Sequence, residues 1–183
     1  MKHPAPSRVF HVMTKPAPLI LTIALDEHSF SFFDAQRRRY FPPDRNFIPA
    51  HLTLFHHLPG DRLDTIQDLL AKTCSAQPRF RLDATHLRSL GRGVAYVLQS
   101  AELAALRASL AQEWSPWLTP QDRQKHQPHV TVQNNVDPQT ARTLLRDLSE
   151  SFAPFQATAL GLDLWWYRGG PWEMVRHIPF IQE

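Results

Sequence analysis

Hydrophobic residues along this chain follow two different spacings, and the two alternate. Runs rich in aliphatic and β-branched residues are typical of buried strands, and hydrophobic residues three and four positions apart are typical of helices packed on a core. The first pattern predicts strands at about 18–25, 49–56, 80–87, 93–99 and 128–133, and in "FQATALGLDLWWY" and "WEMVRHIPF" around a Gly169-Gly170 turn. The second predicts helices over about 27–40, 63–70, 100–114 and 138–148.

The order of these elements repeats along the chain. Strand, helix, strand, helix and strand occur over about residues 18–87 and again over about 93–180. An internal repeat is evidence about architecture before it is evidence about function. Two like lobes packed about an approximate two-fold axis would face each other across a cleft. We therefore expect an α+β fold in which 18–183 form one bilobal domain, preceded by a flexible, proline-rich arm over 1–17.

One strand in each copy carries the same motif. Residues 50–58 read "AHLTLFHHL" and residues 128–136 read "PHVTVQNNV". A strand places residues i and i+2 on the same face, so the histidine and the threonine of each motif should project together. A single H-x-T is weak evidence for a site, but two inside the same longer pattern are not. The residues concerned are His51 and Thr53 in the first copy and His129 and Thr131 in the second.

Two facing histidines are suited to acid–base chemistry. Imidazole titrates near neutral pH, so one ring can be neutral and the other protonated at the same time. Concerted general base and general acid catalysis needs this combination, with one ring on each side of the reacting centre. The threonine hydroxyls beside them can donate hydrogen bonds to an anionic oxygen. The whole set fits a phosphodiester and requires neither a metal ion nor a covalent intermediate.

Composition and charge limit the alternatives. Hydrophobic residues make up 43% of the chain and charged residues 20%, which are ordinary values for a globular protein. The net charge of +3 suits an anionic ligand but falls short of a dedicated duplex-binding module. The "RRR" at 37–39 fits either a phosphate contact or, more commonly, a solvated helix end.

Location and assembly follow from similar observations. No apolar run is long enough to span a bilayer, and the N-terminus lacks the apolar stretch of a secretory signal. The single cysteine, Cys74, rules out an internal disulfide and fits a reducing compartment. We therefore expect a cytoplasmic protein with no membrane contact and no obligate protein partner.

A zinc site is the main chemical alternative. It could draw on His51, His56 and His57, or on His126 and His129, but the sequence has no HExxH motif and no cysteine cluster. In a regular strand His56 would face away from His51. The other histidines have no partner pattern, and we expect them at the surface or in the core: His3, His11, His28, His86 and His177.

The paired motifs, here "HLTL" and "HVTV", resemble those of the 2H phosphoesterase superfamily, and within it the 2′-5′ RNA ligase and RNA 2′,3′-cyclic phosphodiesterase group. The resemblance covers about residues 18–180. It implies two antiparallel-rich sheets forming a central cleft, helices on the outside, and hydrolysis or transesterification without a metal or cofactor. It also implies that His51 and His129 are catalytic, with His129 as base and His51 as acid in hydrolysis. Thr53 and Thr131 would hold the phosphate.

The expected substrate is a 2′,3′-cyclic phosphate or a 2′-5′ linkage, at an RNA 3′ end or in a small nucleotide. RNA 2′-5′ ligation and non-catalytic binding of RNA ends are the alternatives, although binding alone would not need two titratable groups. Many family members carry a basic residue five positions beyond the second motif histidine, where this chain has Asn134. At the same offset from the first motif, where an aromatic residue is usual, it has His56.

Two further residues are expected to contact the substrate. Phe55 could stack on a base, as aromatic side chains do in proteins that bind single-stranded nucleic acid, and Gln133 ends the second motif strand. We expect the other aromatic residues that could stack, Tyr96, Trp165 and Trp166, to pack in the core instead.

Overall fold

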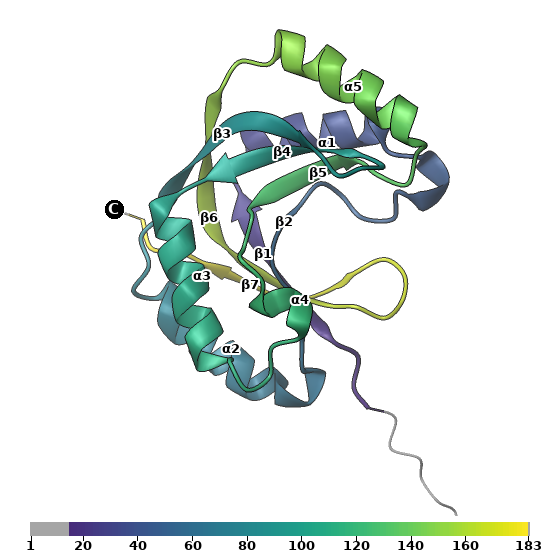
Figure 1. Ribbon diagram of the computed structural model, residues 1–183. Coiled ribbons are helices and arrows are strands. Elements are labelled where there is room, and N and C mark those ends of the chain that lie inside the picture. Colours follow the sequence, from purple (N-terminus) through teal and green to yellow (C-terminus); the bar gives the residue numbers. More distant parts are fainter. Residues whose placement is uncertain (1–14, 183) are drawn as a thin grey trace, which may run out of the picture.

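The predicted strands and helices are present, at nearly the expected positions, in a computed structural model that describes residues 15–182 (Figure 1). The strands are β1 (Leu19–Leu25), β2 (Leu52–Leu58), β3 (Phe80–Ser89), β4 (Val94–Gln99), β5 (His129–Gln133), β6 (Phe155–Trp166) and β7 (Glu173–Pro179). The helices are α1 (Glu27–Tyr40), α2 (Leu63–Cys74), α3 (Ala101–Glu113), α4 (Pro120–Arg123) and α5 (Pro138–Ser151), with short 3-10 turns η1 (Pro43–Arg45) and η2 (Gly60–Arg62).

The ends of the described region bear on two expectations. Most of the expected N-terminal arm, together with His3 and His11, lies outside the described residues. Within residues 15–182, no helix is long and apolar enough to cross a membrane. Three of the helices begin at a capping residue whose side-chain oxygen accepts a backbone hydrogen bond from the first turn: Asp26, Ser100 and Asp137.

The strands form one antiparallel sheet that closes on itself. Its order is β1-β2-β5-β4-β3-β6-β7, and β6 also pairs with β1. β6 is long enough to pair with β3 along its first part and with β7 along its second part, while β1 follows its other edge. The expected α+β fold is confirmed. The two expected sheets are the two halves of this ring, joined where β3 meets β6 and where β2 meets β5.

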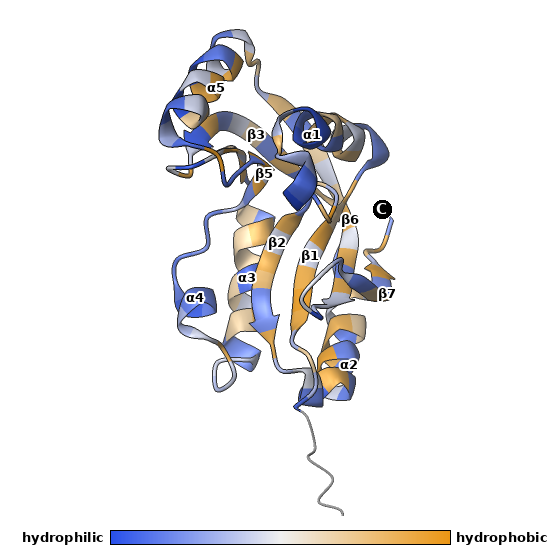
Figure 2. Ribbon diagram, turned by 90° about the vertical axis from the view of Figure 1, so that its right-hand side faces the viewer, coloured by the Kyte–Doolittle hydropathy of each residue, from blue (hydrophilic) through white to orange (hydrophobic). Residues whose placement is uncertain are grey.

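The helices cover the outside of the ring, and α1 and α5 each pack on at least one strand of the other sequence repeat. Figure 1 shows α1 and α5 together over one half, and α2 and α3 over the other. α1 comes from the first repeat but packs on β5 of the second, and α5 packs on β3 and β4. Figure 2 shows β1 and β2 coloured mainly as hydrophobic, whereas α1 carries mostly hydrophilic residues. The core therefore lies between the ring and these helices.

The β2–β5 contact is the narrowest connection in the ring. A single residue pair, Leu52 and Val130, is in register between the two strands. Both side chains are completely buried. Since a normal antiparallel ladder would contribute several backbone hydrogen bonds here, other interactions must hold the two strands together.

Arg37 of α1 provides one of these interactions. Its side chain is only 4% exposed. The guanidinium group donates to the Ile48 carbonyl at 3.0 Å, to the Asn46 side chain at 2.8 Å and to the Thr131 carbonyl of β5 at 2.9 Å. Burial lowers the pKa of Arg37 to about 10, which leaves it charged at neutral pH. For Arg37, both sequence expectations for the arginine run are therefore wrong, since it is neither a solvated residue nor a phosphate contact.

Arg107 of α3 has the corresponding position in the other half. It is also buried, and it donates to the Leu54 carbonyl of β2 at 2.8 Å and to the Asp122 carbonyl at 2.6 Å. A helix from each repeat thus binds, through a buried arginine, the backbone of the motif strand that belongs to the other repeat.

We expect Arg37→Ala to lower the free energy of unfolding by about 1–3 kcal/mol, because buried carbonyl groups lose their donor. Arg39→Ala, in the same helix but at an exposed position, is the matched control and should change it by less than about 0.5 kcal/mol. Urea denaturation followed by circular dichroism measures both. Equal effects for the two variants would show that Arg37 does not brace the sheet.

Candidate active site

The register of β2 and β5 fixes which residues of the two motifs face each other. Leu52 and Val130, the paired residues, occupy equivalent positions in the two sequence copies and point into the core. Successive side chains of a strand alternate between faces, so the residues on either side of this pair share the opposite face. These residues are His51, Thr53, His129 and Thr131.

All four line one cavity of about 190 Å³ on that face of the sheet. The structure therefore brings together the four residues that the repeated motif singled out. Four of the other lining residues carry polar groups or an indole ring and were not expected there: His56, His126, Gln127 and Trp172.

Both motif histidines are oriented by the same local hydrogen bond. Nδ1 of His51 lies 2.8 Å from the Pro49 carbonyl, and Nδ1 of His129 lies 2.7 Å from the Gln127 carbonyl. A carbonyl oxygen can only accept, so Nδ1 carries the proton in each ring. Nε2 of a neutral ring then has a free lone pair, as a general base requires.

Burial controls the charge of these rings. It lowers the pKa of His51 to about 4, against the opposing effect of the Pro49 hydrogen bond, and the nearby charge of Arg37 lowers it further. Burial also lowers the pKa of His129 below its usual value. Both rings are therefore neutral at pH 7 while the cavity is empty. An anion bound between them would favour the return of a proton to one ring.

The backbones of the two threonines are fixed by side chains from other elements. Nε2 of His126 lies 3.0 Å from the Thr53 carbonyl. The Thr131 carbonyl accepts the hydrogen bond from Arg37 described above. These bonds hold the motif strands so that both threonine side chains remain in the cavity wall.

A β-bulge in β2 changes the direction of the residues that follow Thr53. Thr53 pairs with Thr22 of β1 and Phe55 pairs with the adjacent Leu21, so Leu54 is an extra residue in β2. A bulge shifts the alternation of side chains by one position. His56 therefore lines the cavity, and the expectation that it would face away from His51 is wrong.

The same bulge moves Phe55 out of reach of a substrate. Its ring is completely buried, lies edge-on to Trp114 at 5.0 Å, and is covered by the guanidinium group of Arg107 at 3.7 Å. Gln133 is only 4% exposed and does not line the cavity either. Neither of the two expected substrate contacts reaches the site, because both side chains belong to the interior.

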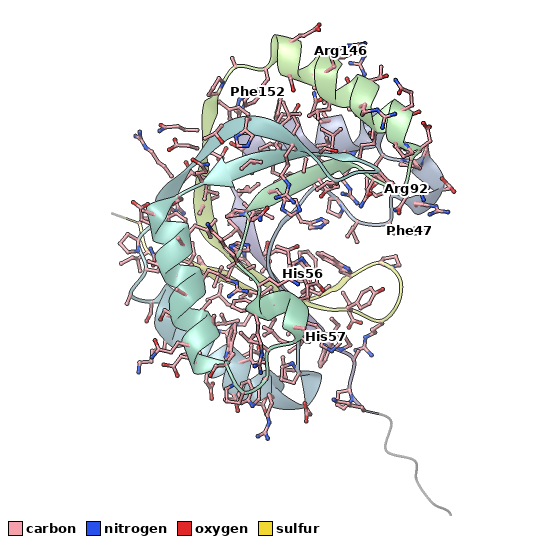
Figure 3. The ribbon with its side chains drawn as sticks, viewed as in Figure 1. Phe47, His56, His57, Arg92, Arg146 and Phe152 are labelled. Carbon is pink, nitrogen blue, oxygen red and sulfur yellow. The ribbon has the colours of Figure 1, made fainter. Side chains whose placement is uncertain are left out.

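A buried carboxylate holds the bulged segment in place. Asp122, in α4, accepts hydrogen bonds from the backbone nitrogen atoms of His56 and His57, both at 2.9 Å, and from Nδ1 of His56 at 3.0 Å. Burial opposes ionisation of Asp122, but these hydrogen bonds outweigh it and lower the pKa of the carboxyl group. Figure 3 shows His56 and His57 beside this helix.

A zinc site would require several ligating side chains close enough together to bind one metal ion. Within residues 15–182, no three histidine, cysteine, aspartate or glutamate side chains form a group that could hold one metal ion. His56 is hydrogen-bonded to Asp122, and His126 to the Thr53 carbonyl, so each already has a protein partner on one ring nitrogen.

Solved structures resemble this fold along almost the whole chain. TT0787 of Thermus thermophilus is 14% identical with a TM-score of 0.62, and the match covers 91% of this chain and 99% of that one. E. coli LigT complexed with 3′-AMP is 18% identical with a TM-score of 0.62, covering 92% of this chain and 100% of LigT. At these identities the likeness shows the fold alone. No curated protein matches the sequence.

A family model provides the remaining evidence. The model described as the 2′-5′ RNA ligase superfamily matches residues 25–171, a range that contains both motif strands. The match extends over most of the chain, in agreement with the ring of strands and with the resemblance of the two motifs. The protein therefore belongs to the 2′-5′ RNA ligase superfamily of 2H phosphoesterases.

Proposed function

We propose that this protein is a metal-independent phosphodiesterase that hydrolyses a 2′,3′-cyclic phosphate or a 2′-5′ linkage at an RNA 3′ end or in a small nucleotide. The observation that carries the proposal is the equivalence of the two histidines. His51 directly precedes β2 and His129 begins β5, at equivalent positions of the two motifs. Both rings line one cavity, and each is fixed through Nδ1 so that Nε2 is available.

The reaction needs one neutral and one protonated imidazole. Nε2 of the neutral ring accepts a proton from water as the water oxygen attacks phosphorus. The bond from phosphorus to one ribose oxygen breaks, and this oxygen takes a proton from Nε2 of the protonated ring. Hydroxyl groups of Thr53 and Thr131 donate to the non-bridging oxygens, where negative charge accumulates. The products are a phosphomonoester and a free ribose hydroxyl, and the two histidines have exchanged protonation states.

The structural neighbours support a nucleotide substrate. Structures of E. coli LigT have been solved with 3′-AMP, with ATP and with phosphate. LigT is 18–22% identical to this chain in these comparisons, so its ligands suggest a substrate class without identifying a substrate. Ligation would use the same two histidines, with a ribose hydroxyl in place of the attacking water.

The roles of the two histidines receive opposing support. Family resemblance favours His129 as the base. Burial, which lowers the pKa of His51 to about 4, favours a neutral His51, the form that a base requires. Substrate chemistry can separate the two assignments, as follows.

We expect hydrolysis of nucleoside 2′,3′-cyclic phosphates or 2′-5′ dinucleotides to persist in excess chelator. His51→Ala or His129→Ala should reduce kcat by roughly 10²- to 10⁴-fold, because each removes a proton-transfer group. Chromatographic detection of the phosphomonoester product measures this loss.

His57→Ala is the matched control, since His57 is adjacent to the cavity-lining His56 but is exposed and lines no part of the cavity. It should retain nearly full activity. Loss of all activity on adding the chelator would contradict metal independence. An unchanged rate in His51→Ala or His129→Ala would remove that histidine from the mechanism.

A 4-nitrophenyl phosphodiester should rescue the variant that lacks the acid and not the one that lacks the base, because its leaving group departs without a proton. Rescue of His129→Ala would establish His51 as the base, and rescue of His51→Ala would establish the reverse. Release of nitrophenolate measures both rates. If neither variant is rescued, protonation of the leaving group is not what the two variants have lost.

The pH dependence follows from the two lowered pKa values. Catalysis by the free enzyme requires one protonated ring. The pKa of each ring is lower than the usual histidine value of about 6.5, so each ring loses its proton at a lower pH than a free histidine does. The value of kcat/KM should therefore peak below pH 6.5 and decrease as the pH rises through neutral. A kcat/KM profile that peaks above pH 7.5 would contradict this electrostatic picture. NMR titration of the His51 ring tests it directly, with inorganic phosphate expected to raise the His51 pKa.

A further inference from the structure

A second and larger cavity adjoins the catalytic one. It has a volume of about 520 Å³, which is within the range of roughly 300–1,000 Å³ typical of small-molecule sites. His51 and Trp172 line both cavities, so the two share a wall. The smaller cavity, at about 190 Å³, leaves little room beyond a phosphate group and the atoms next to it. A larger substituent on that phosphate would extend past Trp172.

Two indole rings form one wall of the larger cavity. The Trp172 ring lies 4.6 Å from the His51 ring and 6.1 Å from the Trp165 ring, measured between centroids. Nε1 of Trp165 donates to the hydroxyl of the buried Thr22 at 3.0 Å, which fixes this indole in the sheet. Trp165 thus lines a cavity, and the expectation that it packs in the core is wrong. Fixed aromatic faces are what a stacking ligand needs.

Exposed hydrophobic side chains stand at the edges of the same cavity. Phe47 is 63% exposed and Met174 is 46% exposed, and both line it. Figure 3 shows Phe47 across from the loop that joins β6 and β7. Large hydrophobic residues gathered and exposed around a cavity indicate a surface that a ligand covers.

Polar groups are present on the same face of the sheet. Asp163 of β6 and His177 of β7 are paired residues, both line the cavity, and Nδ1 of His177 lies 2.6 Å from the Asp163 carboxylate. This bond leaves Nε2 of His177 and one carboxylate oxygen available. A flat heteroaromatic ring would find apolar faces and hydrogen-bonding groups in one place, a combination that a lipid chain would not use.

We propose that the larger cavity is a nucleobase subsite. The base of the nucleotide whose phosphate lies between His51 and His129 stacks on the wall formed by Trp165 and Trp172, and its edge faces Asp163 and His177. This inference rests on the proposed function, because the phosphate in the catalytic cavity is what places the base beside Trp172.

The test compares two substrates that share a five-membered cyclic phosphate. One is adenosine 2′,3′-cyclic phosphate and the other is glycerol 1,2-cyclic phosphate, which has no base. The quantity measured is the ratio of their kcat/KM values, the base preference. Trp165→Leu should lower this ratio by about 5- to 100-fold, the effect of losing one base-stacking contact.

Trp166→Leu is the matched control, because Trp166 is the next residue but does not line the larger cavity. The ratio should stay within about twofold of wild type, since a general loss of stability affects both substrates equally. Met174→Ala is a second test that remains valid if Trp165→Leu misfolds, because Met174 is exposed and its truncation should not disturb folding. This variant should also lower the ratio, since Met174 lines the larger cavity. An unchanged ratio in both Trp165→Leu and Met174→Ala overturns the subsite while leaving the proposed function intact.

Failure of the proposed function gives a different result, namely that wild-type protein hydrolyses neither substrate. In that case, calorimetry measures the affinity of the protein for two probes, adenosine 3′-monophosphate and ribose 5-phosphate, and so tests the subsite without catalysis. Tighter binding of the adenosine compound that is lost in Trp165→Leu supports the subsite. Equal binding of the two probes overturns it.

Discussion

The junction between β2 and β5 is the constraint on which the rest of the site depends. Only one residue pair is in register there, so the strands have few backbone hydrogen bonds of their own. Arg37 and Arg107 compensate, each donating from the helix of one repeat to the motif strand of the other. Because Thr53 and Thr131 come from different strands of this junction and line the same cavity, any separation of the strands would also dismantle the cavity.

Burial of the motif histidines at this junction helps the structure of the site but opposes the charged form that its chemistry needs. It shapes a small cavity, and it also lowers the pKa of both motif histidines, which favours their uncharged forms. The proposed acid–base catalysis needs one proton on the pair, and the charge of an anionic ligand would help to place it there. Under the proposed mechanism, such a site would select anions not only by hydrogen bonds but also by its own protonation. The nearby positive charge of Arg37 adds to the attraction.

The sequence was sufficient for those features that depend on local periodicity. The repeat predicted the order of the elements. The two-residue spacing between histidine and threonine in each motif predicted that His51, Thr53, His129 and Thr131 lie on one face. The bulge at Leu54 could not be predicted, because Asp122 and Arg107, distant in sequence, hold it. It reversed the expectations for Phe55 and His56. The position of Trp165 depends in the same way on the pairing of β1, β6 and β7.

β7 has no counterpart in the first repeat, and this breaks the symmetry of the molecule. A perfectly two-fold cleft would accept a phosphodiester in two opposite orientations. Either histidine could then face either ester oxygen of the phosphodiester. β7 contributes Met174 and His177 to the larger cavity, which is lined by His51 and not by His129. The two ends of the cleft are therefore different, which under the proposed function would give a bound phosphodiester one preferred direction. Duplication would have supplied two interchangeable histidines, and the added strand would have made their surroundings distinct, so that each could specialise.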